Sequence, residues 1–170
     1  MKRLFFALWP DEATRAKIDR LNQSLICKRF KKAKADNLHV TLAFMGNVDE
    51  TTEQAIRQCL SHITAKPITI IFDQLTSWSK ASILCLTSSK PPQQIIDLVE
   101  QLIIVIGEWG VELDSRPYTA HVTLARKALP NPTIILEPIR WSAMSFSLVE
   151  SVSTAEGVEY RVLESWPLGL

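Results

Sequence analysis

The chain has 170 residues, of which 46% are hydrophobic, and this size and composition predict a single domain, residues 1–170, with a substantial core. Its formal net charge is only +1 at pH 7, which excludes a general polyanion-binding surface, so any contact with nucleic acid must depend on local charge. The apolar run near the N-terminus stops at Trp9, before Pro10, and is too short for a signal sequence or a membrane span.

The cysteines indicate the redox environment. Cys27, Cys59 and Cys85 are an odd number, and no two of them form a CxxC motif or another close pair. This usage is typical of a reducing compartment rather than of secretion. We therefore expect a cytoplasmic protein in which the three cysteines are packing residues.

The first half of the chain predicts strands alternating with helices. Residues 3–9 form an almost continuous apolar run, as in a strand buried on both faces. A helix follows from Asp11, a plausible N-cap, and a second strand covers residues 39–44. A second helix is predicted over residues 51–64, where apolar residues recur on one stripe.

The second half predicts two further strands, over residues 68–78 and 82–88. A helix is predicted over residues 91–110, with proline in its first turn and glycine at its end. After a second HVTL strand, we expect residues 145–152 and 159–168 to form a terminal hairpin.

The tetrapeptide HVTL occurs twice, beginning at His39 and at His121. Each copy follows a strand and a helix at a similar spacing, so the chain contains an imperfect internal repeat. A period of this length is too long for a solenoid. It favours two lobes related by a pseudo-twofold axis, with the two HVTL strands facing each other.

The repeated motif predicts a paired arrangement of imidazoles and hydroxyls. Alternate side chains of a strand share a face, so His39 lies beside Thr41, and His121 beside Thr123, roughly 6.5 to 7 Å apart. One neutral histidine could take a proton from a nucleophile while the other, protonated, gives one to a leaving oxygen. The threonines could hydrogen-bond the oxygens of a phosphoryl centre.

Three alternatives lead to different interpretations. A lone strand histidine is most often a core residue, but two identical motifs favour function. A metal site would need a third ligand, and neither tetrapeptide offers one, while His62 is expected in the middle of the second helix as a surface or packing residue. A serine or cysteine nucleophile is disfavoured because there is no GxSxG motif and Cys85 lies in an apolar strand.

With these motifs and their flanks, the chain resembles the 2H phosphoesterase superfamily, and within it the bacterial RNA 2′,3′-cyclic phosphodiesterases, also called 2′-5′ RNA ligases. The resemblance covers nearly the whole chain and rests on RLFFALWPDE, DNLHVTLAFMGNV, RPYTAHVTLAR and the closing segments LVES and YRVLESWPL. It implies an α+β fold of two pseudo-symmetric lobes of mainly antiparallel sheet, with outer helices and a central groove. It also implies hydrolysis of RNA 2′,3′-cyclic phosphate ends to 2′-phosphomonoesters without a metal or other cofactor, and reversible 2′-5′ ligation of tRNA fragments.

The resemblance also implies roles for individual residues. His39 would donate a proton to the 3′ leaving oxygen, and His121 would be the base that activates water. Thr41 and Thr123 would hold phosphate oxygens. Arg126 matches the arginine that follows the family's second motif and is a candidate phosphate contact.

The chain departs from the family's pattern in two places. The first motif has no matching arginine, and Met45 stands there instead, so cationic help from the two motifs is unequal. Before the second motif, Tyr118, Thr119 and Ala120 replace the aromatic residue and proline that the family often has, which leaves the groove wall open to question.

A basic segment, residues 28–34, precedes the first HVTL strand and contains five positive charges. It is either a solvated loop or a surface that attracts the RNA backbone, with an aromatic residue able to stack on a base. The candidate RNA contacts are Phe30, Lys31, Lys32, Lys34 and Trp78.

The sequence therefore predicts a cytoplasmic, monomeric cyclic phosphodiesterase acting on RNA ends. One alternative is a 2H enzyme that acts on a small cyclic nucleotide or an ADP-ribose cyclic phosphate. Another is an RNA-end-binding module without turnover, which the presence of both histidines and both threonines disfavours, because binding alone needs no proton transfer.

Overall fold

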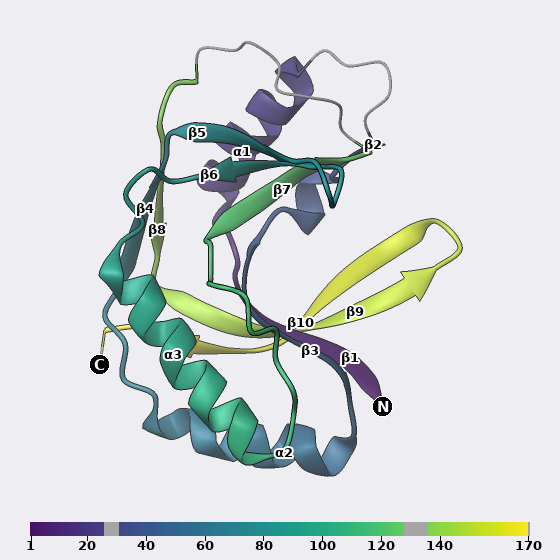
Figure 1. Ribbon diagram of the computed structural model, residues 1–170, viewed down its shortest axis with the longest axis vertical. Coiled ribbons are helices and arrows are strands. Elements are labelled where there is room, and N and C mark those ends of the chain that lie inside the picture. The colour runs from purple at the N-terminus through teal and green to yellow at the C-terminus, as the bar shows by residue number, and fades with distance from the viewer. Residues whose placement is uncertain (26–30, 128–135, 170) are drawn as a thin grey trace.

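The computed structural model describes residues 1–25, 31–127 and 136–169. Short 3₁₀ helices cover Ala35–Asn37 and Leu60–His62. The helices are α1 (Glu12–Ser24), α2 (Glu50–Cys59) and α3 (Gln93–Glu108). The strands are β1 (Lys2–Leu8), β2 (Lys31–Lys32), β3 (Val40–Val48), β4 (Ile68–Phe72), β5 (Gln74–Trp78), β6 (Ile83–Thr87), β7 (His121–Arg126), β8 (Ile139–Ala143), β9 (Ser145–Thr154) and β10 (Gly157–Pro167) (Figure 1).

The main sheet is antiparallel and has the order β10-β9-β1-β3-β7-β6-β5, with β2 paired to β7. Its centre is narrow, because β3 and β7 pair only through Val40 and Val122. Beyond that point the strands diverge, so that β1, β3, β9 and β10 form one lobe and β5, β6 and β7 form the other (Figure 1). The prediction of an α+β fold with two lobes of mainly antiparallel sheet is confirmed.

The internal repeat has a structural counterpart. The unit β1-α1-β3 corresponds to β6-α3-β7, and in each unit the two strands pair antiparallel. Each connecting helix lies on the opposite lobe from its own strands: α1 lies in the half that contains β5, β6 and β7, and α3 lies beside α2 in the other half (Figure 1). The two HVTL strands meet side by side at their first residues rather than face to face along their length.

Local sequence signals explain where two helices begin. The Asp11 carboxylate accepts a hydrogen bond from the Thr14 backbone N–H at 2.7 Å, and Asp49 caps α2 in the same way through Thr52 at 2.9 Å. The second helix ends earlier than predicted, because after Cys59 the chain tightens into a 3₁₀ turn. His62 therefore lies in that exposed turn and not in the middle of a helix.

The apolar run over residues 68–78 is two strands in two sheets, not one. β4 pairs with β8, whereas β5 pairs with β6. The chain changes direction at Asp73, whose carboxylate accepts hydrogen bonds from the backbone N–H of Ser89, at 2.8 Å, and from its hydroxyl. The predicted terminal hairpin is confirmed as β9 and β10.

The core explains the continuous apolar run of the first strand. β1 lies between β3 and β9, and its residues Leu4 to Leu8 are all buried. Cys85 is buried and Cys59 partly buried, while Cys27 lies outside the described residues. Among the described helices, none is long and apolar enough to cross a membrane.

Candidate active site

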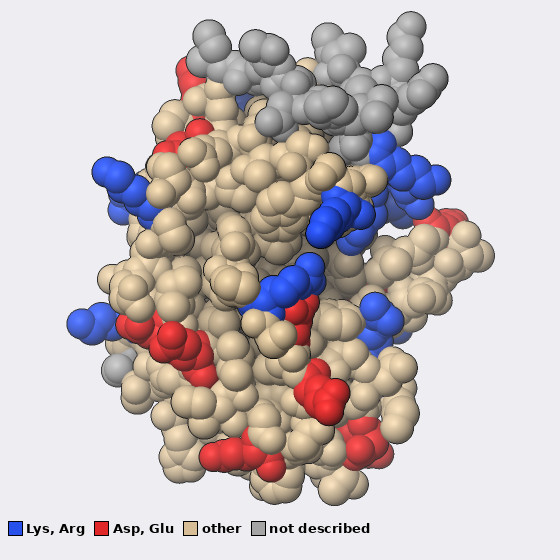
Figure 2. All heavy atoms as spheres, in the orientation of Figure 1, with Lys and Arg blue, Asp and Glu red and all other residues tan. Residues whose placement is uncertain are grey.

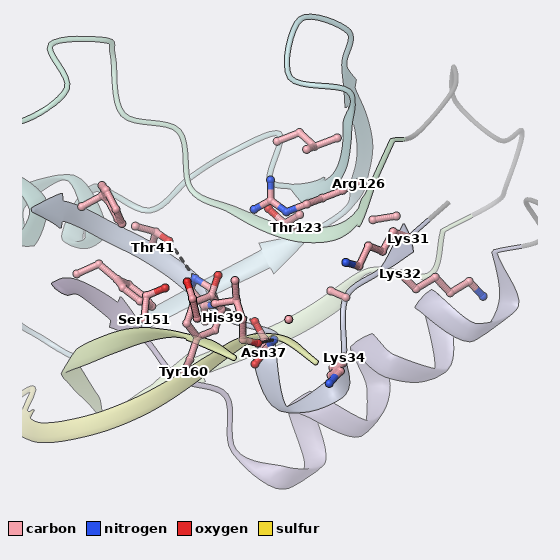
Figure 3. Close-up of a pocket in the computed structure, with 18 of the residues that line it drawn as sticks. Lys31, Lys32, Lys34, Asn37, His39, Thr41, Thr123, Arg126, Ser151 and Tyr160 are labelled. Atoms are coloured by element: carbon pink, nitrogen blue, oxygen red, sulfur yellow. Dashed lines mark hydrogen bonds between the residues drawn. The ribbon is translucent and has the colours of Figure 1, made fainter. Parts of the chain in front are cut away.

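A groove of about 670 Å³ lies between the two lobes. It brings together residues that are far apart in the sequence and that the motifs singled out. These are Lys31, Lys32, Lys34, His39, Thr41, His121, Thr123 and Arg126. In the close-up, Thr41 lies on one side of His39 and the three lysines lie on the other (Figure 3).

His39 is fixed in one orientation by hydrogen bonds to both ring nitrogens. Its Nδ1 lies 2.7 Å from the carbonyl oxygen of Asn37, and its Nε2 lies 3.0 Å from the Thr41 hydroxyl (Figure 3). A carbonyl can only accept, so Nδ1 carries the proton and donates it. In the neutral ring Nε2 then accepts a hydrogen bond from Thr41. The nitrogen available for chemistry is therefore Nε2.

Aromatic rings enclose His39. Trp9 stacks on its imidazole at 5.4 Å with an interplanar angle of 11°, and Phe5 lies 5.1 Å away. Tyr160, from β10, meets the ring edge-on at 5.0 Å. This burial lowers the pKa of His39 to about 4, although the hydrogen bond to Asn37 acts in the opposite direction. Trp9 and Tyr160 were not predicted as site residues.

His121 occupies the equivalent place in the second lobe. Its Nδ1 donates to the carbonyl oxygen of Thr119 at 2.8 Å, as His39 does to the residue two positions before it. Burial lowers the pKa of His121 as well. Trp78 meets the imidazole edge-on at 4.6 Å and is not among the described residues that line the groove. Trp78, predicted as an RNA contact, therefore packs against a site histidine.

A β-bulge on β7 turns Arg126 into the groove, and a matching bulge lies on β3. In a regular strand, a residue five positions after a histidine would point to the opposite face. On β7, however, Cys85 pairs with Thr123 and Leu84 with Ala125, so that Leu124 is an extra residue and the alternation is reversed after it. On β3, Leu42 is the corresponding extra residue. Each bulge places the residue five positions after its histidine, Phe44 on β3 and Arg126 on β7, on the same face as that histidine.

The spacing from each histidine corrects the predicted counterpart of Arg126. Phe44, not Met45, stands in β3 where Arg126 stands in β7, because each lies five residues after its histidine. Met45 is buried, 6% exposed, and packs in the core. Phe44 lines the groove.

Tyr118 connects the two lobes beside the site. Its hydroxyl donates to the carbonyl oxygen of Thr41 at 3.0 Å, and burial raises its pKa. Ala120, which follows it, is buried in the core. The segment that departs from the family's pattern therefore links β3 to the chain before β7, and none of its three residues is among the described residues that line the groove.

The lysines reach the groove because β2 pairs with β7. Lys31 lies opposite Arg126 and Lys32 opposite Ala125. The Lys32 ammonium also donates to the carbonyl oxygen of Gln23 at 3.1 Å, which ties this short strand to the end of α1. Basic side chains gather near the hollow on the side from which the β9–β10 hairpin projects (Figure 2). Phe30 lies outside the described residues.

The donor set does not resemble a metal centre or a thiol nucleophile. Across residues 1–25, 31–127 and 136–169, no group of three or more His, Cys, Asp or Glu side chains could hold a metal ion. The Cys85 sulfur lies 3.9 Å from the Thr123 hydroxyl, and burial raises the pKa of its thiol to about 11. A thiol with so high a pKa is a poor nucleophile at neutral pH.

The arrangement suits acid–base chemistry on an anion. Two imidazoles present nitrogens to one groove, each held by a backbone carbonyl. Both are neutral near pH 7, because burial lowers the pKa of each. Hydroxyl donors and basic side chains surround them, and these groups favour negative charge in the bound molecule.

Comparison with known proteins gives consistent matches. The model of the 2′-5′ RNA ligase superfamily matches residues 9–153. The RNA 2′,3′-cyclic phosphodiesterase of Escherichia coli (strain K12) is 31% identical over 136 residues, which are 79% of this chain and 77% of that protein. The crystal structure of E. coli LigT in apo form has a TM-score of 0.90 at 28% identity and covers 99% of this chain and 98% of that one. The same protein complexed with 3′-AMP has a TM-score of 0.89 at 26% identity, and 99% of each chain is covered.

The family match covers both motifs and the strands that carry them, and the fold agrees with that of the E. coli structures. The chain belongs to the 2′-5′ RNA ligase superfamily, a group of 2H phosphoesterases.

Proposed function

We propose that this protein hydrolyses RNA 2′,3′-cyclic phosphate ends to 2′-phosphomonoesters by a two-histidine acid–base mechanism. The observation that carries the proposal is the pair of His and Thr side chains that two separate strands present to one groove. The name of the E. coli relative, an RNA 2′,3′-cyclic phosphodiesterase, supports the same activity.

The proton transfers balance with two histidines. His121 Nε2 takes a proton from water as the water oxygen attacks phosphorus. The bond from phosphorus to the 3′ oxygen breaks, and protonated His39 gives its Nε2 proton to that oxygen. The product is a 2′-phosphomonoester with a free 3′ hydroxyl. The hydrogen bond of His121 is the more exposed of the two, which suits the group that meets water.

His39 must gain a proton before it can act as the acid. Burial lowers its pKa to about 4 in the unliganded site. A cyclic phosphate carries a negative charge, and an opposite charge nearby raises the pKa of an imidazole. Substrate binding would therefore protonate His39. Its Nε2–H would then donate to the Thr41 oxygen, which frees the Thr41 hydroxyl proton for a phosphate oxygen.

Lys31, Lys32 and Lys34 support RNA as the substrate rather than a small cyclic nucleotide. They extend the cationic lining beyond the two histidines, and a mononucleotide has no further phosphates to meet them. If an RNA 5′ hydroxyl replaces water, the same proton transfers join two RNA ends through a 2′-5′ linkage. We include this ligation in the proposal.

We further propose that residues 1–170 act as one domain, as a monomer in the cytoplasm, on RNA ends such as those of tRNA fragments. One main hydrophobic cluster includes residues of both lobes, which supports a single domain. Both histidines come from one chain, which supports activity without a partner subunit.

The proposal is tested with three substrates at equal concentration: a short RNA ending in a 2′,3′-cyclic phosphate, the free cyclic nucleotide, and an ADP-ribose cyclic phosphate. We expect the highest kcat/KM on the RNA, with a 2′-phosphomonoester as the product. A higher kcat/KM on either small compound would show that this compound, and not RNA, is the preferred substrate. Binding of the RNA without any turnover would indicate a binding module instead.

Removal of metal ions is expected to have no effect on the activity. The site offers two imidazoles and no convergent carboxylate, so full activity is expected after exhaustive treatment with a chelator. The measurement is kcat before and after treatment. Loss of activity with recovery on added zinc or manganese would exclude the two-histidine mechanism.

Replacement of Lys31, Lys32 and Lys34 by Ala is expected to raise KM for an oligonucleotide and leave KM for a mononucleotide nearly unchanged. The salt dependence of oligonucleotide binding should also flatten, by about 0.7 in the log–log slope for each lost phosphate contact. The matched control replaces Lys17, Lys66 and Lys90 by Ala. These lysines are exposed and lie outside the groove, and their replacement removes the same number of positive charges. Equal changes in the oligonucleotide KM in the two triple variants would show that the groove lysines are solvated side chains with no specific role in RNA binding.

A further inference from the structure

Of the three aromatic rings around His39, only Trp9 lies parallel to the imidazole. The two planes differ by 11° and the ring centres are 5.4 Å apart, whereas Phe5 is tilted by 40° and Tyr160 by 81°. This distance and angle are those of an offset stack. Trp9 is half-buried, and it is not among the described residues that line the groove. Its indole therefore acts on the reaction through His39 and not through the substrate.

The local sequence holds Trp9 in place. It follows the last residue of β1 and precedes Pro10, which is buried, and Asp11, the N-cap of α1. A proline restricts the residue before it to extended backbone, so Trp9 is fixed from both sides. The indole also packs with Phe5 and Tyr160 in a small hydrophobic cluster that is separate from the main core. This second cluster lies against the imidazole that the mechanism uses.

The charges around His39 do not favour its protonated form. His121 and Arg126, both on β7, lower the pKa of His39, and so does burial. Among the described residues that line the groove, only Glu156, in the turn between β9 and β10, has a carboxylate, and it forms no ion pair with His39. The ring donates to a backbone carbonyl instead. A stacked aromatic face is therefore the other group in contact that can favour the cation.

The face of an indole attracts a cation. Its π electrons place negative charge above and below the ring plane, and tryptophan has the strongest effect of the aromatic side chains within about 6 Å. A neutral imidazole gains less from this charge than a protonated one. In the proposed mechanism His39 must carry a proton when substrate is bound, so the stack stabilises the form that acts as the acid.

His121 has a different aromatic partner. Its imidazole lies 4.6 Å from the centre of Trp78, but the two planes meet at 70°, so these rings are not stacked. Both histidines donate from Nδ1 to a backbone carbonyl, and in this respect the lobes are equivalent. The aromatic partner therefore distinguishes the two histidines where the repeated motif does not.

We propose that Trp9 is a positioning residue whose indole face stabilises the imidazolium of His39 and keeps this histidine available as the acid. The proposal rests on the proposed function for its reaction. It assigns to Trp9 a role opposite to that of simple burial, because burial removes the proton from His39 and the stacked face retains it.

The test replaces Trp9 by mono-, di- and trifluorotryptophan. Fluorine withdraws electrons from the ring face and hardly changes the size of the ring, so packing and burial are kept while the attraction for a cation weakens. Loss of the attraction lowers the pKa of His39. The basic limb of kcat is therefore expected to move stepwise to lower pH, by about half a pH unit to one pH unit in the trifluoro protein. The same series at Trp109, which is 46% exposed and lies outside the groove, is the matched control and should leave the limb in place.

A second readout needs no turnover. The chain has only three histidines, so their imidazole signals can be assigned by NMR and followed through a pH titration, with His62 as the internal reference. The titration is done with saturating sulfate, an anion whose own charge does not change in this range. The midpoint of the His39 signal should fall stepwise with each fluorine on Trp9 and stay constant in the Trp109 series.

A His39 midpoint that stays constant or rises across the Trp9 series would overturn the proposal, because Trp9 would then only pack against the ring. Failure of the proposed function gives a different result. If the protein hydrolyses no RNA, or if the basic limb of kcat stays in place, a falling His39 midpoint still supports the stacking role of Trp9. The role of His39 as the acid would then be wrong.

Discussion

His39→Ala and His121→Ala are each expected to lower kcat by about 10² to 10⁴-fold, the usual contribution of one general acid or base. The double variant should be little worse than either single one. Once either proton transfer is lost, the concerted path is closed, and residual turnover depends on binding and on the threonines, so the two losses do not multiply.

His62→Ala is the matched control for these variants. His62 is exposed in the 3₁₀ turn after α2 and does not line the groove, so its loss should leave kcat unchanged. Circular dichroism and thermal unfolding should show that all variants remain folded. Near-normal kcat in either His39→Ala or His121→Ala would refute the two-histidine mechanism.

The paired motif could be predicted from the sequence because it depends only on short-range geometry. Alternation along a strand places His39 beside Thr41, and the repeat requires that His121 and Thr123 follow the same rule. The structure brings all four side chains to one groove, with His39 and Thr41 in direct hydrogen-bond contact. The two-lobed sheet also follows from the repeat, because equivalent strands pair in equivalent ways.

The bulges could not be predicted, because pairing register is decided by both strands together. Strict alternation would turn Arg126 away from His121. The extra residue Leu124, opposite β6, returns it to the groove, and Leu42 does the same for Phe44. The prediction of Met45 as the counterpart of Arg126 was wrong for a different reason: Phe44, not Met45, lies five residues after its histidine, and Met45 is a core residue.

The aromatic enclosure of His39 was missed for a similar reason. Trp9 follows the end of β1, and Tyr160 lies on β10, more than a hundred residues away from the histidine. Only the sheet order β10-β9-β1-β3 brings them to the same imidazole. Nothing in the local sequence around either residue indicates such a contact. Both rings pack against the imidazole of His39, whose burial lowers its pKa.

The split of residues 68–78 shows where hydrophobic pattern alone is insufficient. Both halves read as strand, and both are strands. The chain changes sheet at Asp73, where the carboxylate accepts hydrogen bonds from Ser89, after β6. β4 also needs β8 as its partner, and that strand was not predicted.

The dependence of kcat/KM on pH is expected to be bell-shaped, with both limbs below the ordinary histidine pKa of about 6.5. Burial lowers the pKa of His39 to about 4 and also lowers that of His121. A lowered pKa means that the proton leaves at a lower pH than usual, so near pH 7 the free pair is neutral. The proposed active form carries one proton. Its population, and with it kcat/KM, should therefore rise as the pH falls below 7, and fall again once both rings are protonated. The limbs belong to the coupled pair and not to either residue alone.

The basic limb of kcat should lie at a higher pH than that of kcat/KM. The first reports the complex with substrate and the second reports the free protein, and a bound phosphate anion raises the pKa of His39. Measuring both profiles separates the two states. Residual activity of His121→Ala should lack the acidic limb, and that of His39→Ala should lack the basic limb. Loss of the limbs in the opposite order would exchange the roles of acid and base and keep the two-histidine mechanism. A basic limb of kcat/KM above about pH 7, or one that coincides with that of kcat, would show that burial of His39 does not control proton transfer in this groove.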